Sequence, residues 1–162
     1  MQSEPNDVVT PQGLNDMHAD QAQPRSAYQA FTTLPTRWMD NDIYGHVNNV
    51  NYYSFFDTAI AHYLMNEGGL DPWKNEVIGF CVESGCRFRK AIHFPETITS
   101  GFRVAKIGRS SVRYEIGLFR GSDELASAQG HFVHVYVDRA NGRPCPIPDE
   151  MRRVLERITP TS

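Results

Sequence analysis

The sequence is short of the features that mark several large classes of protein. Its 162 residues contain three cysteines, Cys81, Cys86 and Cys145, and no Cys-x-x-Cys pair. An odd number of cysteines in this spacing argues against a disulfide scaffold and a cysteine zinc site, and it fits a reducing cytosol. No apolar run approaches the roughly 20 residues that cross a bilayer, and no basic segment followed by an apolar one resembles a secretory signal. We therefore expect a cytoplasmic protein without a membrane span.

Charge and short motifs exclude further classes. The formal net charge is −3, so nothing indicates nucleic acid as a partner. The sequence has no glycine-rich phosphate loop, no dinucleotide fingerprint and no Gly-x-Ser-x-Gly turn, which argues against a Ser-His-Asp hydrolase. His131 and His134 lie three residues apart on one predicted strand, hence on opposite faces, so they cannot hold one metal together. The sequence predicts no metal site and no cofactor.

The most informative stretch is a polar loop that leads into an amphipathic helix. Three residues, Asn48, Asn49 and Asn51, are suitable helix N-caps, because their side-chain oxygens can accept free amide hydrogens of the first turn. Gly68-Gly69 is typical of a helix end. Large apolar residues recur between these limits at the spacing of one buried helix face, and they are Tyr52, Phe55, Phe56, Ala59, Ile60, Tyr63 and Leu64.

Most of the remaining chain alternates between apolar and polar residues, which predicts strands at 31–38, 77–89, 97–107, 111–120 and 124–137, with a short helix at 150–158. In the 77–89 strand, alternation places Phe80, Val82, Ser84, Cys86 and Phe88 on one face. Tight turns between the strands favour an antiparallel sheet that buries one face on the long helix, an α+β fold. We expect the folded domain at 31–162. Residues 1–30, rich in Gln, Asn, Asp, Ser and Pro, read as a disordered or loosely attached extension.

The loop before the helix suggests a chemical role. The first turn of a helix has unpaired N–H groups and a partial positive charge, and can therefore hold an oxygen that becomes anionic. Asp42 lies a few residues upstream, across a loop that Gly45 allows to fold back. A carboxylate facing such a site suggests attack on a carbonyl, with Asp42 as base or nucleophile. The alternative is that Asp40 and Asp42 only cap the loop or the helix.

The same stretch carries a resemblance to a known family. The residues Asp42, Gly45, Val47, Asn51 and Tyr52 fill the pattern of the hotdog-fold acyl-CoA thioesterases, the group that includes 4-hydroxybenzoyl-CoA thioesterase. The sequence from Gly45 to Asn49 is similar to that of the long-chain acyl-CoA thioesterase branch. The resemblance continues more weakly to about residue 158. It implies a hotdog fold, a five-stranded antiparallel sheet wrapped around one long central helix. It also implies hydrolysis of a fatty or aromatic acyl-CoA, with CoA as part of the substrate.

Roles for individual residues follow from this resemblance. Asp42 matches the catalytic carboxylate, and the backbone N–H of Asn49 matches the helix-start amide that polarises the thioester carbonyl. Asp57 matches a second helix acid, which we expect to orient the loop. His46 is an extra polar group that could orient water or Asp42, or could make only a structural hydrogen bond. The residues expected around the substrate are Gly45, Val47, Asn48 and Tyr52.

Two basic groups could contact the phosphates of CoA. Arg109 lies in a predicted turn with Ser110 and Ser111, and the matching turn in relatives contacts CoA, although a solvated turn arginine is an equal alternative. A second cluster consists of Arg87, Arg89 and Lys90. A solvated sheet face is the simpler reading of that cluster.

The resemblance further implies a homodimer with each active site at its interface, alone or as a dimer of dimers. Joining two sheets at their edges would remove an exposed edge strand. The alternative function is a non-catalytic hotdog domain that binds acyl-CoA or acyl-carrier protein. A hotdog hydratase is a third reading, but His46 is not in the setting of that family's catalytic histidine. The sequence indicates neither the acyl chain length nor whether the acyl group is carried by CoA or by acyl-carrier protein.

Overall fold

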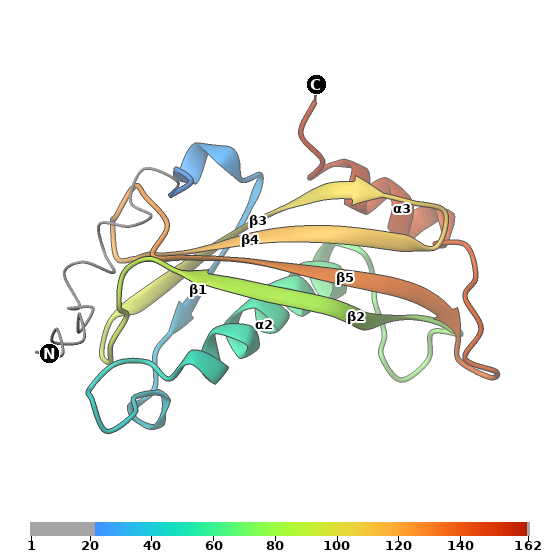
Figure 1. Cartoon of the computed structure of the whole chain (residues 1–162). Coiled ribbons are helices and arrows are strands. Elements are labelled where there is room, and N and C mark those ends of the chain that lie inside the picture. Colours follow the sequence, from blue (N-terminus) through green and yellow to red (C-terminus); the bar gives the residue numbers. More distant parts are fainter. Residues whose placement is uncertain (1–21, 162) are drawn as a thin grey trace, which may run out of the picture.

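The computed structural model describes residues 22–161, which form one sheet, two α-helices and two short 3-10 helices. Figure 1 shows these elements in chain order. Their bounds are η2 (Arg25–Ala27), β1 (Ala30–Pro35), η3 (Trp38–Asp40), α2 (Asn49–Glu67), β2 (Val77–Phe88), β3 (Thr97–Ile107), β4 (Ser111–Arg120), β5 (Ala128–Asp138) and α3 (Asp149–Glu156). Within residues 22–161, no helix is long and apolar enough to cross a membrane.

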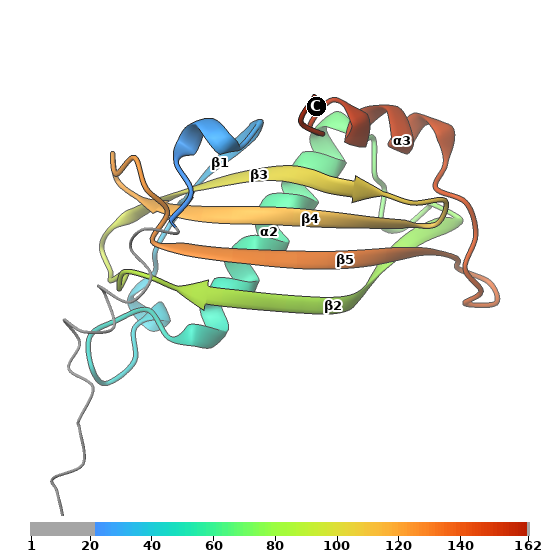
Figure 2. The ribbon, with the colours of Figure 1, turned by 45° about the horizontal axis from the view of Figure 1, so that its top comes forward.

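The five strands form a single sheet in the order β1-β3-β4-β5-β2, with every neighbouring pair antiparallel. Helix α2 crosses one face of this sheet, as the turned view in Figure 2 shows. The core lies between the two layers, where alternate residues of the inner strands meet the apolar face of the helix. Its largest fully buried side chains include Tyr114, Phe56, Phe102 and Ile60. The predicted α+β fold, one antiparallel sheet on one long helix, is confirmed.

Helix α2 begins and ends where its capping residues stand. The Val50 N–H donates to Asn48 Oδ1 over 3.1 Å, which makes Asn48 the N-cap among the three candidate asparagines. At the other end the Gly68 N–H donates to the Leu64 carbonyl, and Gly69 takes φ +61°, a conformation that glycine adopts at little cost. The helix thus spans the segment that apolar periodicity predicts.

The alternation expected in β2 is interrupted by a bulge. Cys81 pairs with His134 of β5 and Glu83 pairs with Val133, so Val82 is left without a partner in the register. Because paired residues share a face, Phe80, opposite Val135, lies on the outer face, whereas Cys86, opposite Gly130, lies on the face of α2. The prediction that Phe80 and Cys86 share one face is therefore wrong. The extra residue in the bulge shifts the alternation by one.

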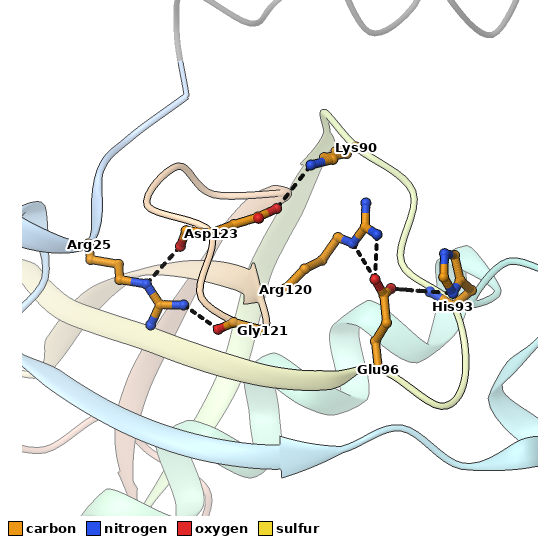
Figure 3. Close-up of polar contacts among 7 residues, drawn as sticks. All are labelled: Arg25, Lys90, His93, Glu96, Arg120, Gly121 and Asp123. Carbon is orange, nitrogen blue, oxygen red and sulfur yellow. Dashed lines mark hydrogen bonds and ion pairs between the residues drawn. The ribbon is translucent and has the colours of Figure 1, made fainter.

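Residues 22–29 pack onto the outer face of the sheet, the face turned away from α2. The Tyr28 ring is 6% exposed and lies against Phe119 at 5.8 Å between ring centres. Arg25 donates from Nε to the Asp123 carbonyl and from Nη2 to the Gly121 carbonyl, each over 2.7 Å (Figure 3). The packed domain therefore includes residues before the expected boundary at 31. The rest of the expected extension, residues 1–21, lies outside the described residues.

Candidate active site

The loop that precedes α2 is closed by hydrogen bonds to Asp40. The Asp40 carbonyl accepts from the Asn48 N–H at 2.8 Å and from Asn51 Nδ2 at 2.9 Å. Its fully buried carboxylate accepts from the Arg37 backbone N–H at 2.6 Å and from Arg37 Nε and Nη2 at 3.1 and 2.7 Å. A bridge between Asn41 and Val47 closes the loop a second time. Asp40 is thus the anchor that fixes the loop to the start of the helix.

Within this loop, Asp42 is held in a tight turn by one of its two carboxylate oxygens. Its Oδ1 accepts from the Tyr44 N–H at 2.8 Å, and its backbone N–H donates to the His46 carbonyl at 2.8 Å. Gly45 adopts φ +79°, which allows the chain to reverse direction here. No donor within residues 22–161 bonds to Asp42 Oδ2, and the side chain is half-buried. One oxygen of the carboxylate therefore remains available to a ligand or water.

The first turn of α2 leaves one amide unsatisfied. The Val50 N–H donates to Asn48 Oδ1 and the Asn51 N–H to the Asn48 carbonyl. The Asn49 N–H stands at the first helical position, where no intrahelical acceptor exists, and residues 22–161 supply no other acceptor. The N–H is at the positive end of the helix dipole on an exposed residue. It can donate to the oxygen of a bound molecule.

Two residues expected around the substrate lie beneath the loop. Val47 is 4% exposed, and its N–H donates to the Ile92 carbonyl at 2.7 Å. Tyr52 is also 4% exposed and meets Phe88 edge-on at 4.8 Å. Burial raises the pKa of Tyr52 to about 12, and a hydrogen bond with the Ile92 backbone opposes this only in part. In this chain both side chains support the loop from the core.

The other polar side chains proposed for catalysis are differently placed. His46 is exposed, and its ring makes no hydrogen bond within residues 22–161; only its carbonyl is engaged, by Asp42. Asp57 lies eight residues along α2 from Asn49, about 12 Å at 1.5 Å per residue. No described contact joins Asp57 to the loop it was expected to orient. Its electrostatic partner is His134 on β5, whose pKa is lowered by burial and raised in part by Asp57.

The structure does not bring the Arg109 turn to this site within one chain. The loop and the start of α2 adjoin the first residue of β3, because Pro35 pairs with Thr97 and the Val47 N–H bonds Ile92. The turn formed by Arg109 and Ser110 follows the last residue of β3, and Ser111 starts β4. The 11 residues of β3 separate the two ends by about 35 Å.

A partly buried ion pair behind the loop was not anticipated from the sequence. Glu96 accepts from Arg120 Nε at 2.7 Å and from the His93 N–H at 2.9 Å, as Figure 3 shows. Burial alone would raise the pKa of Glu96, but the hydrogen bonds from Arg120 and His93 hold it below its ordinary value. The Glu96 carbonyl also accepts from the Thr36 N–H at 3.3 Å. Glu96 thus ties the 93–96 bend to the segment that enters the loop.

The sequence signals for the two supporting acids were weak. Arg37 and Asp40 stand at i and i+3, a spacing that only suggests a local pair. Glu96 and Arg120 are 24 residues apart, so only the fold reveals their contact.

Within residues 22–161, no three His, Cys, Asp or Glu side chains gather as possible metal ligands. The arrangement therefore offers a carboxylate, a free helix-start amide and a rigid frame.

A comparison with protein-family models shows the family to which this chain belongs. The model of the Thioesterase-like superfamily matches residues 36–155, which include the loop, the long helix and the strands β2 to β5. The chain belongs to the thioesterase-like superfamily. No functionally curated protein matches the sequence.

Several solved structures share the fold of this chain. The PA5185 protein from Pseudomonas aeruginosa strain PAO1 is 49% identical, with a TM-score of 0.84 over 85% of this chain and 96% of that one. The gentisyl-coenzyme A thioesterase BH1999 is 22% identical, with a TM-score of 0.70 over 78% and 99%. A thioesterase from Thermus thermophilus, complexed with coenzyme A and Zn, is 23% identical, with a TM-score of 0.69 over 81% and 94%. These two more distant structures share the fold.

In this thioesterase-like domain, the family match covers every residue of the loop described above. The family resemblance drawn from Asp42, Gly45, Val47, Asn51 and Tyr52 is thus confirmed. Membership supports thioester hydrolysis in general. The substrate and the roles of single residues are matters for proposal.

Proposed function

We propose that the protein hydrolyses an acyl-CoA thioester to the free acid and CoA. The observation that carries the proposal is the unsatisfied Asn49 N–H at the start of α2. The loop that leads into this helix start also carries Asp42, whose Oδ2 has no donor among residues 22–161. An amide donor with no acceptor among residues 22–161, at the positive end of a helix, is suited to an oxygen that gains charge during reaction. The match to the thioesterase-like superfamily supports this chemistry.

In the proposed reaction, the thioester carbonyl oxygen accepts the Asn49 N–H. Asp42 either removes a proton from water as it adds to the carbonyl carbon, or attacks that carbon itself and forms a mixed anhydride that water then cleaves. In both routes the carbon–sulfur bond breaks and CoA leaves as its thiolate. The developing oxyanion is stabilised by the N–H and the helix dipole, and one such donor contributes on the order of 10² to 10³ in rate.

We also propose that the active protein is a homodimer joined along β2. This strand is the longer of the sheet's two edge strands, with 12 residues against 6 in β1, and it exposes Phe80 (52%), Val82 (60%) and Phe88 (45%). A long, apolar edge is a ready partner for a second strand. A two-fold axis would make the pairing antiparallel and close the assembly.

Such pairing gives the Arg109 turn a function. In each chain the end of β2 at Phe88 lies at the same end of the sheet as the start of α2, and the start of β2 at Val77 lies at the other end, near Arg109. Antiparallel pairing of the two edges would place the Arg109 turn of one protomer at the sheet end that carries Asn49 of the other. The exposed guanidinium of Arg109 could then contact the phosphates of CoA. The Thermus thermophilus relative, which is complexed with coenzyme A, supports this choice of ligand.

The test compares Asp42→Asn with a matched substitution elsewhere. Asparagine keeps the side-chain oxygen that accepts from the Tyr44 N–H, so the turn is retained while the base or nucleophile is lost. Asp71 makes the same turn, accepting from the Trp73 N–H at 3.0 Å, far from the loop, and Asp71→Asn serves as the control. We expect Asp42→Asn to lower kcat on acyl-CoA esters at least a hundredfold and Asp71→Asn to leave it unchanged.

Binding is measured in parallel with a CoA thioether that cannot be hydrolysed. Retained binding with lost turnover in Asp42→Asn supports the proposed mechanism. Equal thiol release by both variants would show that Asp42 is structural. If the wild type binds the thioether but releases no thiol from short, long or aromatic esters, the alternative of a non-catalytic acyl-CoA or acyl-carrier-protein binding domain replaces the enzyme.

A further inference from the structure

The outer face of the sheet, opposite α2, contains a hollow of about 620 Å³. Its charged lining comes from four strands and the residue after β2: Arg87, Arg89, Arg103, Arg113, Glu115 and His131. We call it the arginine hollow. It is separated by the sheet from the loop and helix start described above.

Two glycines allow rings to lie close against the sheet beside this hollow. Gly85 of β2 pairs with His131 of β5, and a Cβ on Gly85 would lie 2.6 Å from the His131 ring. A Cβ on Gly117 of β4 would lie 2.7 Å from the Tyr28 ring, which rests over that strand. The rings of His131 and Tyr28 therefore lie directly over these glycines, and both line the hollow together with the arginines.

Among residues 22–161, the lining of this hollow contains four arginines and one glutamate. Arg103 is neutralised by Glu115, through Nε at 2.9 Å and Nη2 at 2.7 Å. Arg113 reaches Glu83 at the rim over 3.3 Å, a carboxylate that His131 Nε2 also contacts at 2.8 Å. Glu115 and Glu83 thus bind Arg103, Arg113 and His131. Neither carboxylate compensates the charge of Arg87.

The two remaining arginines differ in how they are held. Arg89 is only 8% exposed, and its Nε donates to Gln129 Oε1 over 3.0 Å, which fixes the direction of its guanidinium. The same oxygen accepts from the Gln23 N–H, so the Gln129 amide group turns its two N–H donors away from these contacts. Arg87 is exposed, and no residue within 22–161 forms a hydrogen bond or ion pair with its side chain.

We propose that the arginine hollow binds a phosphoryl group. Guanidinium groups match the oxygens of phosphate with paired N–H donors, and they keep their charge when buried. An anion here would offset the charge of Arg87, the group that closes over the ligand. The Gln129 amide, which accepts from Arg89 Nε through its oxygen, supplies further donors.

Two sources could supply this phosphoryl group. It belongs either to the nucleotide part of CoA, reaching around the sheet edge, or to a separate nucleotide or phosphate. In the first case the inference extends the proposed function, and in the second it is independent of it. Direct binding measurements keep the two proposals separate, because the Asp42→Asn experiment reports on turnover and leaves the outer face unchanged.

The test is calorimetric titration of the full chain with inorganic pyrophosphate, ADP and CoA. Arg87→Gln removes the exposed guanidinium without disturbing a buried contact. Arg143→Gln, an equally exposed arginine beyond β5, makes the same change of charge as a control. We expect pyrophosphate affinity to fall at least tenfold in Arg87→Gln and to stay within twofold of wild type in Arg143→Gln, with binding weakened by added salt.

Competition identifies the source. If CoA is the ligand, Arg87→Gln raises KM for acyl-CoA, leaves kcat unchanged and does not affect hydrolysis of an acyl-pantetheine, which lacks the nucleotide. If a separate phosphate is the ligand, ADP and the CoA thioether bind together without competing. The inference fails if no probe binds the wild type, or if Arg87→Gln and Arg143→Gln bind equally. A change in sedimentation of Arg87→Gln without any probe bound would mark the hollow as a contact between copies, which also overturns it.

Discussion

Replacing Asn49 by proline would remove the backbone N–H that is proposed to bind the thioester oxygen, while the helix would be retained. Proline lacks the backbone N–H, and it is well tolerated at the first helical position, where that N–H has no intrahelical partner. The residue before it, Asn48, already has ψ 140°, the extended conformation that proline requires of its predecessor. The Asn49 side chain is exposed and makes no described contact. The substitution is therefore compatible with the fold.

The size of the effect follows from what is lost. If the Asn49 N–H stabilises the oxyanion, its removal lowers kcat on the order of 10² to 10³, equivalent to about 3–4 kcal/mol of transition-state stabilisation. The free energy of unfolding changes by less than about 1 kcal/mol, because a compatible proline mainly restricts the unfolded chain. Asn49→Ala is the control, since it removes the same side chain but retains the N–H. We expect Asn49→Ala to keep near wild-type kcat.

The assay is thiol release from an acyl-CoA ester under saturating conditions, with urea unfolding of each variant. Folded Asn49→Pro protein with the kcat of Asn49→Ala would refute the assignment of the oxyanion donor. Equal and large losses in both variants would mean that the side chain, rather than the N–H, contributes to the site. Only a loss confined to proline agrees with the geometry of the helix start.

Three other predictions concern the frame around the site. Gly130→Ala places a Cβ 2.4 Å from the fully buried Phe56 ring, so we expect a loss of about 1–3 kcal/mol in urea unfolding, partly recovered in the double variant with Phe56→Leu. Burial lowers the pKa of His134 below its ordinary 6.5, so the unfolded chain binds a proton more readily; stability should fall as pH drops below about 6.5, and His134→Gln should flatten that dependence. Val82→Lys, on the edge strand β2, should weaken self-association at least tenfold in sedimentation, whereas Leu125→Lys on the hairpin should not.

Patterns among residues close in sequence predicted most of the helices and strands. The apolar spacing from Tyr52 to Leu64 reports one helix face directly, and capping by Asn48 and a left-handed Gly69 depends on near neighbours in sequence. The bulge at Val82 has no such local signal, because it depends on the register against β5. Alternation alone therefore placed Phe80 on the same face as Cys86, which the register contradicts.

For the candidate site, the sequence indicated the loop but not its supports. The motif around Asp42 placed that acid and Asn49 together, and both lie on the closed loop and helix start. The burial of Asp40 and the contact of Glu96 with Arg120 depend on packing between distant segments, which no spacing reports. The position of Arg109 at the far end of β3 follows from strand direction, so its assignment to the site requires a second protomer.

The double closure of the loop has a consequence for how substrate preference can change. One carbonyl, that of Asp40, receives both the Asn48 N–H and the Asn51 amide, and the Asn41–Val47 bridge lies just inside this ring. A ring closed in this way has a fixed circumference, so an inserted or deleted residue would rotate the helix start away from the carboxylate. Diversification must then proceed by exchanging side chains at constant length. Positions free for such exchange include Ile43 and Tyr44, 93% and 79% exposed at the tip of the loop.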